Sequence, residues 1–279
     1  MILTSVTEQI RRGYADPPLG QLHYAECGSG PALVLLHQTP RSHDEFLELM
    51  PLLRSDVRAI AMDMYGFGLS AKPTGPQTIE QYAEGVLSLA DALGLVEFSL
   101  LGHHTGAVVA VEVAARAPER VHSVVLSSPS LTDATYRERH AGGPDVDNAA
   151  HVADGSHLTT LWSQREPFYP PDLKVNLLDR FIRDALAPGV DPMEGHNACA
   201  RYVMEDRIQA VVAPVLILAA GADPFAFPDV EPTRAALTGA SSVEVVTLED
   251  GTIPMVEQRP QEIAAAVLPF IASHLGVRL

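Results

Sequence analysis

Short apolar runs alternate with amphipathic stretches over most of the chain. Apolar runs bounded by turn residues predict strands, and apolar residues that recur with the helical period predict helices. The predicted strands are 9–14, 21–26, 32–36, 57–62, 98–101, 123–126, 215–219 and 243–248. The predicted helices are 42–53, 79–93, 107–117 and 260–275. The first two strands suit a hairpin, and the later alternation favours an α/β fold with a mostly parallel central sheet flanked by helices.

The region 131–207 interrupts this alternation. It carries aromatic residues and helical patterns, among them Trp162 and Phe168, but no convincing strand. A segment inserted between two strands of one sheet is well placed to cover the carboxyl edge, where open α/β sheets bind ligands. We therefore expect a core formed by 1–130 and 208–279 and a helical lid at 131–207. The alternative is a second small domain without a gating role.

The most informative local pattern is Gly102-x-His104-x-Gly106, which lies between a predicted strand and a predicted helix. Its spacing is that of the nucleophile elbow G-x-S-x-G, a sharp turn that holds a reactive side chain above the sheet. Histidine stands here in place of the serine. The sequence therefore predicts the frame of a hydrolase without its usual reactive oxygen.

Taken together, four motifs in order resemble those of the α/β-hydrolase superfamily over nearly the whole chain. They are His37-Gln38-Thr39-Pro40 (H-G-x-P), Asp63 to Ser70 (D-x-x-G-x-G-x-S), the elbow, and Ala220-Gly221-Ala222-Asp223-Pro224 (G-x-x-D-P with alanine in place of its glycine). The resemblance implies the α/β-hydrolase fold. It also implies an oxyanion hole formed by the backbone N–H groups of Thr39 and Thr105, and Asp223 as the acidic member of a triad.

The chain departs from that family at the two residues that matter most for its chemistry. Thr252 stands where the similar stretch G-H-x-P-x-x-E-x-P has its catalytic histidine, so the triad order becomes His104, Asp223, Thr252. A serine hydrolase needs a hydroxyl nucleophile and an imidazole that takes its proton. We therefore expect no serine acyl-enzyme. Gln38 likewise replaces a family glycine.

An imidazole at the elbow suits a general base, because a free histidine titrates near ~6.5. We hypothesise that His104 leans toward Asp223, which would hold it directly or through the Thr252 hydroxyl or a water. A base beside an oxyanion hole can activate water against an ester, lactone or activated ketone, or remove a proton next to a carbonyl as in lyases, isomerases and cyclases. The non-enzymatic alternative is a pseudoenzyme that binds a small, largely apolar ligand.

Five further residues are candidates for substrate binding, each with a plainer structural alternative: Gln38, His103, Trp162, His196 and Phe225. In the similar G-H-S-x-G elbow the position of His103 serves packing. His196 falls in the predicted lid, where it is a substrate contact, a missing acid–base partner or a solvated residue.

No metal or cofactor is expected. His37, His103 and His104 lack the spacing of a zinc site, and no dinucleotide fingerprint occurs. The two cysteines predict no disulfide framework, and with the lack of a secretory leader they favour a cytoplasmic protein. A net charge of −16 argues against nucleic acid and anionic membranes. The expected partner is a small-molecule substrate, and the oligomeric state is open.

Overall fold

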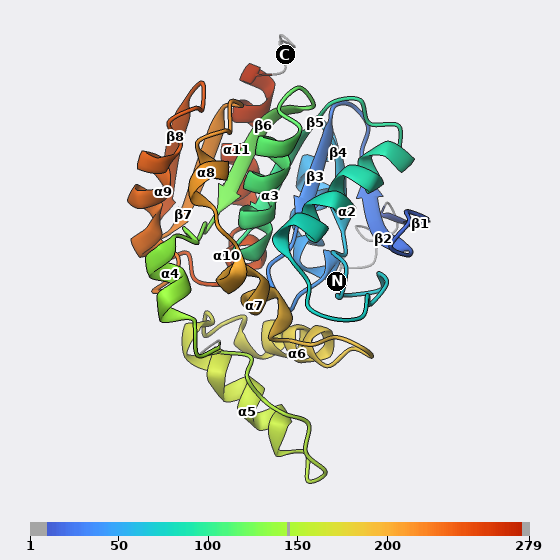
Figure 1. Cartoon of the computed structure of the whole chain (residues 1–279), viewed down its shortest axis with the longest axis vertical. Coiled ribbons are helices and arrows are strands. Elements are labelled where there is room, and N and C mark those ends of the chain that lie inside the picture. The colour runs from blue at the N-terminus through green and yellow to red at the C-terminus, as the bar shows by residue number, and fades with distance from the viewer. Residues whose placement is uncertain (1–9, 144–145, 275–279) are drawn as a thin grey trace.

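The computed structural model describes residues 10–143 and 146–274, whose strands form an eight-stranded sheet. The spatial order is β1-β2-β4-β3-β5-β6-β7-β8 (Figure 1). The strands are β1 (Arg11–Ala15), β2 (Leu22–Cys27), β3 (Ala32–Leu36), β4 (Arg58–Met62), β5 (Phe98–His103), β6 (Val121–Ser127), β7 (Val215–Ala220) and β8 (Val243–Leu248). β2 pairs antiparallel with β1 and β4, and all other neighbours are parallel. The predicted mostly parallel sheet is confirmed.

The predicted element bounds hold to within a few residues at most positions. Strands 32–36 and 243–248 coincide with β3 and β8, whereas residue 9 of the first predicted strand and residue 275 of the last predicted helix lie outside the described residues. The single helix predicted over 42–53 is wrong. The chain instead forms the 3-10 helix η2 (His43–Phe46) and the short helix α1 (Met50–Leu53). Pro51 explains the break, because proline has no N–H to continue a helix but is tolerated in a first turn.

Helices cover both faces of the sheet. One core contains side chains of α2 (Ile79–Ala92), α3 (Thr105–Arg116), α8 (Glu205–Ile208) and α9 (Val230–Ala236), and the other those of α1, α10 (Met255–Gln258) and α11 (Pro260–His274). Successive residues of a strand point to opposite faces. Val34 therefore lies in the first core and Leu33 and Leu35 in the second, which explains why β3 is apolar at every position.

Between β6 and β7 the chain leaves the sheet as a helical segment, which Figure 1 shows beyond one edge of the strands. It contains α4 (Ala134–Arg139), α5 (Ser156–Arg165), η3 (Glu166–Phe168), α6 (Lys174–Ala185) and α7 (Glu194–Arg201) before α8. The segment has a small apolar core of its own around Leu161, Leu178 and Phe181. Its role as a lid and the limits 131–207 remain predictions. Within the described ranges, no helix is long and apolar enough to cross a bilayer.

Candidate active site

His104 occupies a sharp turn between β5 and α3. Its backbone has φ 46° and ψ −112°, in a region that L-residues rarely adopt, and its N–H donates to the Ser127 carbonyl at 3.0 Å. The flanking glycines are required by close backbone contacts. A Cβ on Gly102 would lie 2.1 Å from the Gly106 oxygen, and one on Gly106 would lie 2.0 Å from the Leu36 oxygen. The turn therefore has the geometry of a nucleophile elbow with an imidazole at its apex.

Asp223 lies beside that imidazole. It follows β7, and its Oδ2 is 2.9 Å from Nε2 of His104, with only 1% of the Asp223 residue exposed. The two groups meet at ion-pair distance without the alignment of a linear hydrogen bond. Burial alone would raise the pKa of Asp223, but the charge of His104 and the backbone N–H groups of Phe225 and Ala226 outweigh it and leave that pKa lowered. The carboxylate is thus kept ionised next to the ring.

Thr252 does not join this pair, which corrects the expected bridging role. Its hydroxyl and its backbone N–H both donate to Oε1 of Gln258, each at 2.8 Å. The Gln258 amide also donates to the Asp250 carbonyl, so this side chain organises the whole turn and draws the Thr252 hydroxyl toward α10. Ile253, the next residue, lines the cavity in its place.

His103 is buried under the elbow and does not line the cavity, so its prediction as a substrate-binding residue is wrong. It is 0% exposed, its Nε2–H donates to the Ile253 carbonyl at 2.9 Å, and its Nδ1 accepts from the Ser127 hydroxyl at 2.9 Å. Burial and the nearby charge of His104 lower the pKa of His103 to about 3. The neutral ring therefore ties the loop after β8 to the base of the elbow.

Two backbone N–H groups are candidates for an oxyanion hole. Thr105 is the first residue of α3, where an N–H has no partner within the helix, and Thr39 follows β3 on the facing loop. Both residues line the same cavity as His104. His37 supports this loop, because its Nδ1–H donates to the Gln38 carbonyl and its Nε2 accepts from the Met64 N–H.

Gln38 is fixed by a buried acid, Glu45, that belongs to none of the motifs. The Gln38 backbone N–H and side-chain amide donate to the two carboxylate oxygens of Glu45 at 2.8 and 2.6 Å. Burial raises the pKa of Glu45 to about 8, against the opposing charge of Arg41. Arg41, itself 1% exposed, donates a hydrogen bond to Glu257 at 2.7 Å. Gln38, which stands where the family has glycine, thus ties the loop after β3 to Glu45, next to the buried ion pair of Arg41 and Glu257.

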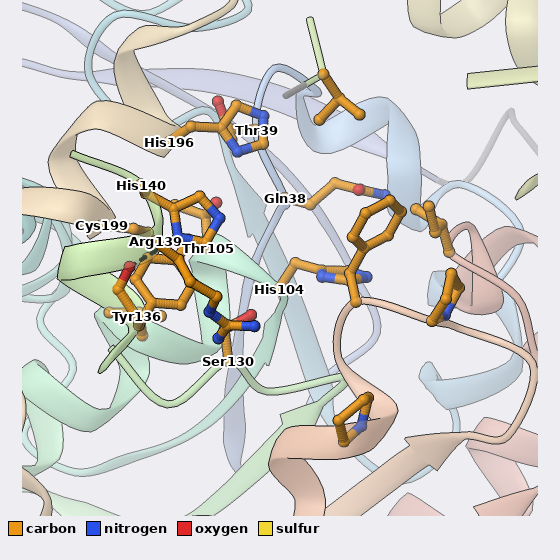
Figure 2. Close-up of a pocket in the computed structure, with 16 residues that line it drawn as sticks. Gln38, Thr39, His104, Thr105, Ser130, Tyr136, Arg139, His140, His196 and Cys199 are labelled. Carbon is orange, nitrogen blue, oxygen red and sulfur yellow. Dashed lines mark hydrogen bonds between the residues drawn. The ribbon is translucent and has the colours of Figure 1, made fainter. Parts of the chain in front are cut away.

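A cavity of about 320 Å³ opens onto His104 (Figure 2). Of the predicted residues, Gln38, Thr39, Thr105, His196 and Phe225 line it. Trp162 does not, so its predicted substrate contact is wrong; it packs against the inserted segment's own core. Which residues Trp162 packs against depends on how the inserted segment folds, and the local sequence pattern does not show that.

Part of the cavity lining was not predicted from the sequence. Tyr136, Arg139 and His140 reach the cavity from α4 and the residue after it, and the Tyr136 and His140 rings stack at 4.1 Å. Their i, i+3, i+4 spacing on one helix face was the available signal. Asp147, whose Oδ2 contacts Nε2 of His196, gave no comparable signal in the sequence, because the two residues are 49 positions apart.

Among the described residues, one group has three close potential metal ligands: His23, His43 and Asp63. Both carboxylate oxygens of Asp63 are already taken, with Nδ1 of each histidine at 2.9 Å and further backbone donors from His43 and Leu69. This arrangement fits a structural role that fixes the loop after β4. Both ring nitrogens of His37 and of His103 already have hydrogen-bond partners within the protein.

Comparisons with known proteins agree on the type of fold. The family model described as alpha/beta hydrolase fold matches residues 31–251. Haloalkane dehalogenase 2 of Mycobacterium bovis is 32% identical over 114 residues, which cover 40% of each chain. Bifunctional epoxide hydrolase 2 of Mus musculus is 36% identical over 130 residues, which cover 44% of this chain and 23% of that protein. The similarity thus spans less than half the length of these relatives.

Solved structures extend the likeness to more than nine-tenths of the chain. The epoxide hydrolase CorEH superposes with a TM-score of 0.77 at 23% identity, covering 95% of this chain and 99% of that chain. The enol-lactonase from Burkholderia xenovorans gives a TM-score of 0.75 at 21% identity, covering 93% of this chain and 100% of that chain. At such identities the likeness shows a shared fold.

Proposed function

Since the chain belongs to the α/β-hydrolase family, we propose that it is a hydrolase in which His104 acts as a general base and no serine acyl-enzyme forms. The observation that carries this proposal is the contact between His104 and Asp223, 2.9 Å apart at the apex of the elbow and beside the cavity. Because Nε2 is the ring nitrogen beside the carboxylate, at 2.9 Å, Nδ1 is the nitrogen left to accept a proton. A base so held is oriented before the substrate arrives.

In the proposed reaction, His104 removes a proton from water as the water oxygen bonds to a carbonyl carbon. The carbonyl electrons move onto its oxygen, which the Thr39 and Thr105 N–H groups stabilise. Loss of one such donor costs about 3–4 kcal/mol in other enzymes, and a positioned base contributes ~10²–10⁴-fold. The two effects together supply substantial catalysis without a covalent intermediate.

The proposed substrate is a small carbonyl compound, such as an ester, lactone or activated ketone. A cavity of about 320 Å³ fits a small molecule. Phe225 and Val108 offer apolar walls, whereas Gln38 and Ser130 offer polar contacts. The inserted helical segment would serve as the lid over this space, since Phe168 of η3 packs on Phe225 with ring centroids 4.9 Å apart. The hydrolytic names of the relatives favour hydrolysis over the lyase, isomerase and cyclase alternatives.

The proposal is tested by assaying p-nitrophenyl esters and lactones with the wild type and His104→Ala. We expect turnover by the wild type and a loss of about 10²–10⁴-fold in kcat/KM for the variant. His122→Ala is the matched control, because that histidine lies on β6 and pairs with Glu97 at 3.1 Å.

Two results would overturn the proposal. The first is His104→Ala activity equal to that of the wild type. The second is that none of the esters and lactones is turned over while one of them raises the melting temperature of the wild type, which would identify a binding protein.

A further inference from the structure

The cavity is lined by a second imidazole that has its own carboxylate. His196 lies on α7, and its Nε2 is 2.8 Å from Oδ2 of Asp147. Figure 2 shows His196 and His104 among the side chains around the same cavity, and they come from the inserted segment and the elbow. We propose that His196 is a second catalytic residue, the general acid that protonates the leaving group, and that Asp147 positions it. This inference rests on the proposed function.

Asp147 is held so firmly that its contact with His196 is well defined. The carboxylate is 0% exposed, its backbone has φ 60°, and Arg165 binds both of its oxygens, with Nε donating to Oδ1 at 2.8 Å. Arg165 is buried too and lies over the Phe181 ring at 4.9 Å. Because Arg165 already balances the charge of Asp147, this carboxylate does not need His196 as a partner. The carboxylate instead orients the His196 ring.

The pair is built against the proposed oxyanion hole. Gly195, next to His196, packs so closely on Thr39 that a Cβ there would lie 2.3 Å from the Thr39 hydroxyl oxygen. Arg165 also donates to the Thr39 carbonyl at 3.3 Å. The His196 side chain is 22% exposed, and its Nδ1 has no hydrogen-bond partner among the described residues. One ring nitrogen is therefore tied to Asp147 while the other remains for a ligand.

The two imidazoles divide the proton transfers of an ester hydrolysis. His104 takes a proton from water as the new C–O bond forms, which leaves an imidazolium and a tetrahedral oxyanion. When the oxyanion collapses, the bond to the leaving oxygen breaks and imidazolium His196 gives that oxygen its proton. His104 is then protonated and His196 neutral, and exchange with bulk water returns both to their starting states.

A general acid matters most for a poor leaving group. Alkoxide needs a proton as it departs, whereas p-nitrophenolate leaves without one. We therefore compare ethyl butyrate with p-nitrophenyl butyrate, which share an acyl group. For His196→Gln we expect kcat/KM to fall at least ~10²-fold on the ethyl ester and to stay within about threefold on the p-nitrophenyl ester.

The control is His151→Gln, an exposed histidine of the same segment, which should leave both rates unchanged. Asp147→Asn should show the same leaving-group selectivity as His196→Gln. If that variant does not fold, as thermal melting would show, His196→Gln alone decides, since its partly exposed ring tolerates glutamine. Equal losses on both esters, or no loss on either, would overturn the role of His196. Loss of activity in His104→Ala with no selectivity in His196→Gln would refute this inference and leave the proposed function standing.

Discussion

Replacing Asp223 by Asn removes one charge beside His104 and keeps the shape of the side chain. Oδ1 of Asp223 accepts from the Phe225 N–H at 2.9 Å and from the Ala226 N–H at 3.2 Å, and the oxygen of an amide can keep both contacts. The amide nitrogen then takes the place of Oδ2, 2.9 Å from Nε2 of His104. Because an amide nitrogen only donates, it favours the tautomer whose proton sits on Nδ1. The nitrogen proposed as the base then presents a proton to the cavity.

The size of the effect follows from the charge that is lost. Proton abstraction creates an imidazolium beside a carboxylate, and two unit charges 2.9 Å apart attract by about 6 kcal/mol at an effective dielectric constant of about 20. Part of this is offset by the amide dipole and by relaxation of the ring. We expect a fall of 10²–10⁴-fold in kcat/KM, which corresponds to about 3–5 kcal/mol.

The assay is steady-state hydrolysis of p-nitrophenyl butyrate at pH 7.5, with thermal melting as a check on folding. Asp250→Asn is the matched control, because that carboxylate is exposed on the loop after β8 and pairs with Arg259. If Asp223→Asn keeps more than about a third of wild-type kcat/KM while His104→Ala loses activity, the ring works without the carboxylate and the tautomer argument fails.

Two further substitutions test the frame around the site. Gly106→Ala places a Cβ 2.0 Å from the Leu36 oxygen, so urea unfolding should show a loss of about 3 kcal/mol or more, whereas Gly142→Ala, with no neighbour within 4 Å, should change little. Glu45, held by Gln38, has a pKa raised from 4.5 to about 8. Protonated Glu45 therefore contributes to the free energy of unfolding in full below about pH 4.5, and this contribution is lost as the pH rises through about 8. Glu45→Gln should remove that part of the fall in unfolding free energy between pH 5 and 8.5, and an unchanged fall would contradict the assignment.

The fold could be predicted from the sequence because its strands and its elbow depend on residues that are close together in the chain. β3 is apolar at each position because it is buried on both faces. An apolar run between turn residues predicts a strand whatever the place of that strand in the sheet. Gly102 and Gly106 are likewise a local requirement, since the turn brings their own backbones into contact. Where a local rule was overlooked, at Pro51, the prediction of one continuous helix failed.

The candidate site was less accessible because its contacts join distant parts of the chain. His196 could be suspected from its place in the inserted segment, but its partner Asp147 lies 49 residues away in a turn without any motif. Trp162 was expected at the cavity as an aromatic residue of the inserted segment, but it packs against the small core of that segment. Glu45 could not be picked out from the sequence, because it follows the polar residues His43 and Asp44 and nothing local shows that its carboxylate is buried.

The two substitutions in the triad order are parts of one change. With serine at the elbow, an imidazole must stand between the hydroxyl and the acid to carry a proton. His104 reaches further than serine and contacts Asp223 itself at 2.9 Å, so no residue is needed between them. Thr252 is accordingly turned away and bonded to Gln258. In the proposed function His104 and Asp223 act as a two-residue pair, so His104 and Thr252 are to be considered together when the chemistry of this site is altered.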